Sequence, residues 1–213
     1  MAYVPKKKHR SSLSTPNIFS VRVELLDVKP VVWRELILDG RTRLAALHHI
    51  IQAAMGWTDA HLHEFEIREQ LYGELKPEIP DFDHASKPRL DERKFRLNQL
   101  LTIGDTFLYR YDYGDNWQHQ VTVIDIDDGG DPAHADGLVL ITAGGQACPP
   151  EDAGGSSGYQ NMLTTWEAAP YGQAAKEIQE WAGLDFDPDR FDRHAANAAI
   201  QRLIWNRWIK IGS

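Results

Sequence analysis

Two histidines separated by one residue give the sharpest candidate for chemistry in this sequence. His61 and His63 lie in HLHEFEIR, an alternating stretch at residues 61–68. Side chains two positions apart on a β-strand project from the same face, so both imidazoles can reach one metal ion. The alternative is ordinary packing, with His63 against Phe65 and Trp57. Two histidines without a third ligand at a fixed spacing favour packing.

A second group of candidates lies in YDYGDNWQH at residues 111–119. Asp112, Asp115 and His119 are candidate catalytic residues, because a carboxylate that orients an imidazole can support general acid–base catalysis. The competing interpretation is structural. Asp115 or Asn116 then occupies a left-handed turn position, and Trp117 packs with the tyrosines of the hairpin.

The two groups together define the candidate metal site. If the strand at 61–68 lies beside the second segment, His61, His63 and His119 join an aspartate in the mixture of imidazole and carboxylate found at zinc, manganese and iron sites. A divalent metal is therefore a candidate cofactor, although the spacing favours a protein without one.

A glycine-rich segment, ACPPEDAGGSSGY at residues 147–159, is the best candidate for contact with a ligand or partner. Glycine allows close backbone approach, and free amides before a helix near Tyr159 can bind an anion. The lysine of a P-loop is missing. Acidic neighbours raise the pKa of Cys148, which favours a buried thiol over a nucleophile. The candidate binding residues are Cys148, Glu151, Asp152, Gly154, Gly155, Tyr159 and, from the hairpin, Trp117.

Alternating apolar and polar residues predict the strands that must position these side chains. The predicted strands cover residues 19–27, 31–38, 61–68, 106–113, 117–127 and, at a sheet edge, 138–142.

Helical spacing of apolar residues predicts a helix that starts at an N-cap, Thr42, and stops at Gly56. His48 and His49 lie off its apolar stripe, so we interpret them as flank residues of the helix and not as ligands. Further helices are predicted after residue 158, with Gly183 ending one and either Asp187 or Asp192 capping the last.

The order of these elements predicts an α+β fold with a β-grasp-like mixed or antiparallel sheet, one packed helix and C-terminal helices. Residues 1–17 form a flexible basic tail, and residues 18–213 form a single domain. Within that domain, 143–158 is a Gly/Pro-rich loop and 159–213 is helical.

Charge separates the tail from the domain. Lysines and an arginine between residues 6 and 10 give the tail four cations and no acid, whereas the total net charge is -8. The domain is a poor match for the phosphate backbone, so nucleic-acid binding would run through the tail or a small local patch. A single cysteine, no apolar stretch of membrane-spanning length and no secretory signal predict a soluble, cytoplasmic protein without a membrane partner.

Several motifs resemble one known family. These are ALHHIIQAAMGWTDAHLHEFEI at 46–67, YRYDYGDNWQHQVTV at 109–123 and ACPPEDAGGSSGY at 147–159, supported by VKPVVWREL, DERKFRL and FDPDRFD. In their order they resemble the plasmid pRiA4b ORF-three-like family, whose members include insertion-sequence passengers labelled TnpR. The resemblance implies a mobile-element accessory context, without recombinase chemistry.

Two functional hypotheses follow. The first is an accessory or binding protein with a protein or nucleic-acid partner. The alternative is a metal-dependent hydrolase or nuclease-like enzyme that uses the His/Asp residues, so whether the chain is an enzyme stays open at this point.

Overall fold

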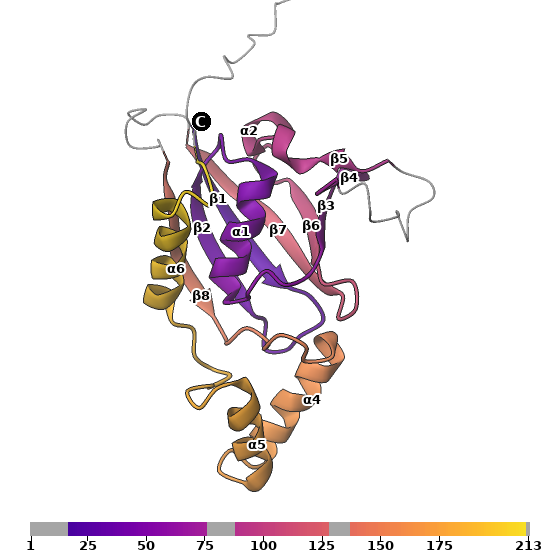
Figure 1. The fold of residues 1–213 in the computed structure, drawn as a ribbon, viewed down its shortest axis with the longest axis vertical. Helices are drawn as coiled ribbons and strands as arrows, with labels where there is room; N and C mark the ends of the chain where they lie inside the picture. Colours follow the sequence, from indigo (N-terminus) through magenta and orange to yellow (C-terminus); the bar gives the residue numbers. More distant parts are fainter. Residues whose placement is uncertain (1–16, 76–87, 128–136, 212–213) are drawn as a thin grey trace, which may run out of the picture.

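The computed structural model describes residues 17–75, 88–127 and 137–211 (Figure 1). The predicted basic tail therefore lies outside the described residues. The described strands, in chain order, are β1 (Ile18–Leu25), β2 (Trp33–Asp39), β3 (His63–Ile67), β4 (Gln70–Gly73), β5 (Leu90–Asp91), β6 (Thr106–Tyr111), β7 (Trp117–Asp127) and β8 (Val139–Gly145). The helices are α1 (Leu44–Met55), α2 (Leu97–Leu100), α4 (Gly155–Ala168), α5 (Gln173–Ala182) and α6 (Arg193–Trp205), with a 3₁₀ turn at Glu92–Lys94.

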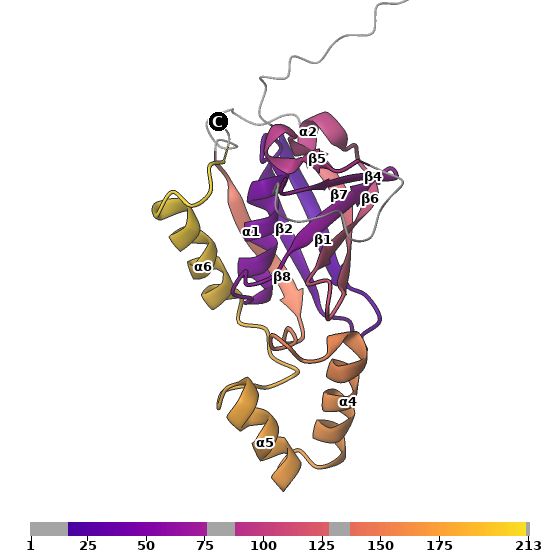
Figure 2. The same ribbon diagram turned by 45° about the vertical axis from the view of Figure 1, so that its right-hand side comes forward.

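The strands form one mixed sheet in the order β5-β4-β3-β6-β7-β1-β2-β8. Neighbouring strands are antiparallel except β4 and β5, which are parallel. The helix α1 crosses one face of this sheet, α6 lies beside it along β8, and α4 and α5 pair beyond the end of the sheet (Figures 1 and 2). The predicted α+β class and mixed sheet are confirmed, whereas the β-grasp likeness stays a prediction.

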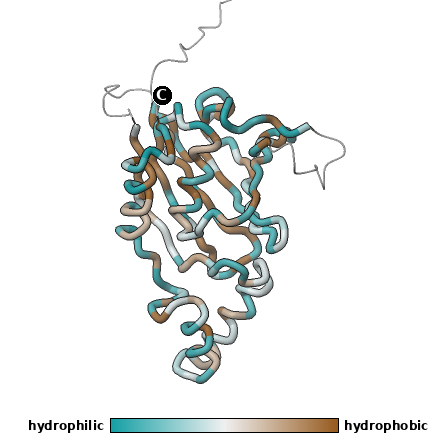
Figure 3. Tube along the Cα trace, viewed as in Figure 1, coloured by the Kyte–Doolittle hydropathy of each residue, from teal (hydrophilic) through white to brown (hydrophobic). Residues whose placement is uncertain are grey.

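Strand alternation places the core where the sequence predicted it. In β1 the apolar members Phe19, Val21, Val23 and Leu25 are buried, and the polar residues between them are partly exposed. Apolar residues follow the strands through the middle of the molecule (Figure 3). Burial of these side chains is what fixes the sheet beneath α1.

The start of α1 differs from the prediction. Arg43, not Thr42, is the N-cap residue, and no side chain caps this end. Thr42 is itself buried, so its hydroxyl is packed inside the protein. The stop at Gly56 is confirmed, since this residue adopts the left-handed conformation with φ 92°.

The predicted loop at 143–158 is shorter in the structure. Gly144 and Gly145 extend β8 and pair with β2, and α4 already begins at Gly155. A Cβ atom on Gly144 would lie 2.4 Å from the Phe191 ring, so glycine permits this close approach within a strand. The last helix, α6, is capped by Asp192, whose side chain accepts a hydrogen bond from the Ala195 amide.

The sheet ends at β8, as predicted for an edge strand. The Asn197 side chain on α6 accepts from the Ile141 amide at 2.9 Å and donates to the Ile141 carbonyl at 3.0 Å. This side chain thus occupies the hydrogen-bonding position of a neighbouring strand. Over the described part of the chain, the helices are too short or too polar to cross a membrane.

Candidate metal centre

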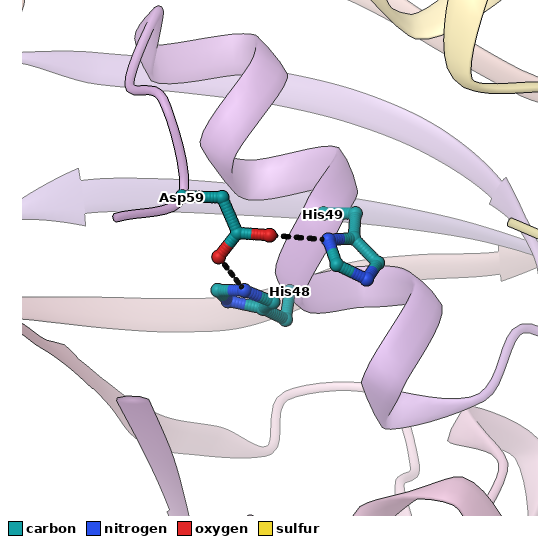
Figure 4. A group of neighbouring side chains, drawn as sticks. All are labelled: His48, His49 and Asp59. Carbon is teal, nitrogen blue, oxygen red and sulfur yellow. Dashed lines mark hydrogen bonds and ion pairs between the residues drawn. The ribbon is translucent and has the colours of Figure 1, made fainter. Parts of the chain in front are cut away.

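A single carboxylate joins the two adjacent histidines of α1. Asp59 Oδ1 lies 2.6 Å from His48 Nε2, and Asp59 Oδ2 lies 2.9 Å from His49 Nδ1 (Figure 4). One ligand atom from each of the three residues lies within 4.8 Å of the other two. Two imidazoles and a carboxylate so close together are a ligand set for a divalent transition metal.

The local chain path brings Asp59 back to the helix. The left-handed Gly56 ends α1, and Asp59 itself has φ 60°. The Asp59 amide donates to Gln52 Oε1 at 3.2 Å, which fixes the returning segment against the last turns of the helix.

A closed ring of hydrogen bonds supports His48 from behind. His48 Nδ1 lies 2.8 Å from the Tyr109 hydroxyl, and Gln52 Nε2 donates to that hydroxyl at 3.0 Å. Gln52 in turn accepts from Asp59, which closes the ring. Outer partners of this kind orient a metal-binding histidine and select its tautomer.

The protonation states follow from burial and from these partners. Burial lowers the pKa of His48 to about 4, so the ring is neutral near pH 7. Since a carboxylate only accepts, Nε2 carries the proton toward Asp59. Partial burial opposes ionisation of Asp59, but the hydrogen bonds to His48 and His49 outweigh it and hold the pKa of the carboxyl well below its usual range.

A second histidine–carboxylate pair lies directly against the first. His63 Nε2 is 2.8 Å from Glu92 Oε2. The His63 ring stacks on His48 with centroids 3.4 Å apart and planes 3° from parallel. Both members of the second pair are largely buried, with side-chain exposures of 9% and 6%.

These groups line a cavity of about 510 Å³. Besides His48, His49, Asp59, His63 and Glu92, its lining includes His61, Glu74, Arg89 and Arg93. The volume falls in the range of small-molecule sites, which is about 300–1,000 Å³.

Three carboxylates from two different segments surround His61 at the border of this cavity. Its Nε2 lies 3.7 Å from Asp112 Oδ2, 3.8 Å from Glu151 Oε2 and 3.7 Å from Asp152 Oδ1. Adjacency of the 61–68 strand and the second hairpin was the condition for a shared site, and in the structure His61 lies near Asp112 of that hairpin and near Glu151 and Asp152 of the glycine-rich segment.

The glycine-rich segment is held in place by the neighbouring loops. Glu151 accepts from the Thr58 amide at 2.8 Å, and the Gly154 amide donates to Asp115 Oδ2 at 3.1 Å. A Cβ atom on Gly155 would lie 2.5 Å from the Asp115 carbonyl oxygen. Asp115 thus supports this segment and takes no position beside Asp112 and His61 in the close group of possible ligands.

His119 does not join the other candidates. Its ring is fully buried on the face of β7 that carries Trp117 and Val121, and it packs edge-on against Trp57. Burial lowers its pKa to about 4. It belongs to neither of the ligand groups found among the described residues.

Three further predicted binding residues, Tyr159, Trp117 and Cys148, are packed within the chain. The Tyr159 hydroxyl donates to the Ala147 carbonyl at 2.9 Å, and Trp117 is buried in the core. Burial raises the pKa of the Cys148 thiol, which stays protonated at neutral pH. A nucleophilic Cys148 was not favoured by the sequence either.

His48 and His49 are the residues that sequence reasoning missed. Helical periodicity places them off the apolar stripe but does not reveal which residues face them. The carboxylate comes from the segment after the helix, and the stacked ring comes from β3. The adjacent pair His48-His49 followed by an aspartate beyond the helix end is the signal that could have found them.

The chain is similar to one protein family, to a curated relative and to a solved structure. Residues 17–195 match the family model described as "Plasmid pRiA4b ORF-3-like protein". "Uncharacterized protein y4hQ" of Sinorhizobium fredii (strain NBRC 101917 / NGR234) is 35% identical over 193 residues, covering 88% of this chain and 92% of that protein. The crystal structure of MM3350, a protein of unknown function from Methanosarcina mazei Go1, has a TM-score of 0.71 and 30% identity over 84% of this chain and 97% of that one.

Proposed function

The chain belongs to the plasmid pRiA4b ORF-3-like family, and we propose that it acts as a metal-dependent hydrolase whose divalent ion is bound by His48, His49 and Asp59. The observation that carries this proposal is the close approach of three ligand atoms, within 4.8 Å of one another, at the wall of a cavity of about 510 Å³.

Three protein ligands leave positions for water and substrate on a transition metal. With an ion bound, His48 would offer Nε2 to it, and the ring proton would move from Nε2 to Nδ1, which lies 2.8 Å from the Tyr109 hydroxyl. A metal-bound water is acidic enough to supply hydroxide near neutral pH. His63, stacked on His48 and paired with Glu92, is the candidate base that receives the proton.

Of the two arginines at the same cavity, Arg93 is the one accessible to an anionic group of a substrate. Arg89 is paired with the buried Glu64 at 3.0 Å, so its charge is largely compensated. Arg93 pairs with Asp91 but has 61% of its side chain exposed, which leaves it accessible at the cavity.

Metal binding is tested with purified protein stripped of metal by a chelator and titrated with Zn²⁺, Mn²⁺ and Fe²⁺ under anaerobic conditions. We expect one equivalent of one of these ions to bind and to raise the melting temperature.

Because His49 is partly exposed, H49Q keeps the fold and should weaken binding about 100-fold. The matched control is H194Q, which alters an exposed histidine on α6. Equal affinity of H49Q and H194Q, or no binding at all, contradicts the metal site.

Hydrolysis is tested separately with 4-nitrophenyl acetate and bis(4-nitrophenyl) phosphate. The metal-loaded protein should cleave at least one of them, and H63Q should lose most of the rate while it retains the metal. Metal binding without turnover of either ester would leave a metal-binding protein and reject the hydrolase assignment.

The accessory role remains a second, sequence-based proposal. A mobile-element context, a cytoplasmic location and a protein or nucleic-acid partner stay predictions. The basic residues between 6 and 10 lie outside the described part of the chain, and the glycine-rich segment is bonded to Thr58 and Asp115.

A further inference from the structure

A second cavity contains a buried cation at its wall. Arg34 on β2 is 1% exposed. Its Nε donates to the Ala54 carbonyl at 2.9 Å, and Nη1 donates to the carbonyls of Trp33 at 2.7 Å and Gly145 at 2.9 Å. These bonds tie the guanidinium to α1, β2 and β8, so its position is fixed.

No carboxylate compensates this charge within the described residues. None of the ion pairs found there includes Arg34. Its hydrogen bonds are all donated by Nε and Nη1, and Nη2 takes part in none of them. Burial lowers the pKa of Arg34 to about 10, so the group is still charged at pH 7. The nearby Cys148 cannot supply an anion, because burial raises the pKa of its thiol. An uncompensated buried charge is costly, and an anion beside it removes that cost.

The carboxylates that line the same cavity are already engaged. Glu151 accepts from the Thr58 amide and hydroxyl. Asp192 caps α6 through the Ala195 amide. A second cation of the lining, Arg190, lies 3.8 Å from Asp192 Oδ2. The cavity therefore has two acids with their own partners, and of its two cations only Arg34 has no acidic partner among the described residues.

The rest of the wall is mainly apolar. The cavity measures about 380 Å³ and lies among the end of α1, the segment after β8, and α5 and α6. Alanines and two phenylalanines form much of the lining, and the Phe191 ring lies 3.8 Å from Arg34 Cζ. A mainly apolar pocket with one buried charge that lacks a partner favours a ligand that carries one opposite charge on a hydrocarbon body.

We propose that this cavity binds a small organic carboxylate, with Arg34 as the counter-charge and the apolar wall around the hydrocarbon part. A guanidinium matches a carboxylate geometrically, and the apolar wall favours this ligand over strongly hydrated inorganic anions. The site is distinct from the histidine cavity, because the two linings share no residue. Its test is therefore independent of the proposed hydrolase.

The probes are benzoate and hexanoate, each compared with its neutral amide. Calorimetry on the full chain, with metal removed, should show that each carboxylate binds about tenfold or more tightly than benzamide or hexanamide. Ala199 lines the cavity, whereas Ala198, next to it on α6, is exposed. A199F fills the cavity and should lower the affinity about tenfold or more, while A198F keeps it and controls for the effect of phenylalanine on the helix.

A change of the cation itself gives a second measurement. R34K retains a charge but loses the planar group, and it should bind benzoate more weakly than the parent chain while its circular dichroism stays the same. If R34K fails to fold, the comparison of A199F with A198F still decides. Equal binding of acids and amides, absence of binding, or unchanged affinity in A199F overturns the proposal.

Discussion

The imidazole rings of His48 and His63 lie face to face, 3.4 Å apart, and each has its own carboxylate, Asp59 and Glu92. Burial and, to a lesser degree, the neighbouring His63 lower the pKa of His48. The His63 ring therefore disfavours a proton on His48. The stack links the candidate metal ligand to the candidate base.

Stability should fall in mildly acidic solution. The folded-state pKa values of His48 and His119 are about 4, below the unfolded value of about 6.5. Protons therefore bind the unfolded chain more readily, so stability is full above about pH 6.5 and is lost as the pH falls toward 4. Each histidine contributes a loss of about 2 kcal/mol between about pH 6.5 and 5.

Urea unfolding of the metal-free protein at several pH values measures this loss. The H119Q variant should show about half the slope of the parent chain, since one of the two histidines is removed. A free energy of unfolding that does not change with pH over this window would contradict the buried, neutral rings.

The Tyr109 hydroxyl should support both stability and metal affinity. In Y109F, His48 Nδ1 and Gln52 Nε2 lose their buried partner, at a cost of about 1–3 kcal/mol. Loss of an outer partner should also weaken Zn²⁺ binding about 10–100-fold. Urea unfolding and zinc calorimetry measure the two effects.

Y72F is the matched control for this change. Tyr72 is buried, but its hydroxyl makes none of the hydrogen bonds found in the described ranges. Its removal should leave stability and zinc affinity near those of the parent chain. If Y109F has the same stability and zinc affinity as Y72F, the ring of hydrogen bonds does not support His48.

Contact between Gly155 and Asp115 should be sensitive to a single methyl group. G155A places a Cβ atom 2.5 Å from the Asp115 carbonyl oxygen at a residue with φ 70°. We expect a loss of about 1–3 kcal/mol from strain and displacement of the segment. G104A is a control for the backbone alone, because Gly104 also has a positive φ but its Cβ would meet nothing within 4 Å. The melting temperatures from thermal unfolding measure this loss. Equal decreases in melting temperature for G155A and G104A would argue against the contact.

Cys148 should be unreactive in the folded protein. Cys148 is partly buried and the pKa of its thiol is raised, so the reactive thiolate is scarce. Iodoacetamide at mildly alkaline pH should label the urea-unfolded chain about 100-fold faster than the folded one, as followed by mass spectrometry. Rapid labelling of the folded protein would show an exposed thiol.

Local patterns predicted the elements better than the site. Alternation located β1, β2 and the β6–β7 hairpin because one face of each is buried. The prediction that Thr42 caps α1 was wrong, because the N-cap is Arg43. The position of the cap depends on the backbone angles at Arg43, which the residue type does not reveal. The prediction that β8 ends before the loop glycines was wrong, since β8 includes Gly144 and Gly145. The ring of Phe191, about fifty residues away, lies where a side chain at Gly144 would be, and a local pattern cannot show this contact.

The site itself was predicted in part. His61 and Asp112 meet through adjacent segments, which the order of elements made foreseeable. His119 turns inward with Trp117 and Val121, and its position on their face of the strand already indicated burial. The pairing of His48 with Asp59 depends on the path of the chain after Gly56, which no periodicity encodes.

The amide of Asn197 has a consequence for how copies of this chain meet one another. An exposed sheet edge can recruit a strand from another molecule, which is a common route to aggregation. Because both polar groups of the Ile141 backbone are already bonded to Asn197, the middle of β8 offers no free partner to an incoming strand. One side chain on a helix therefore protects the molecule against sheet extension at this edge.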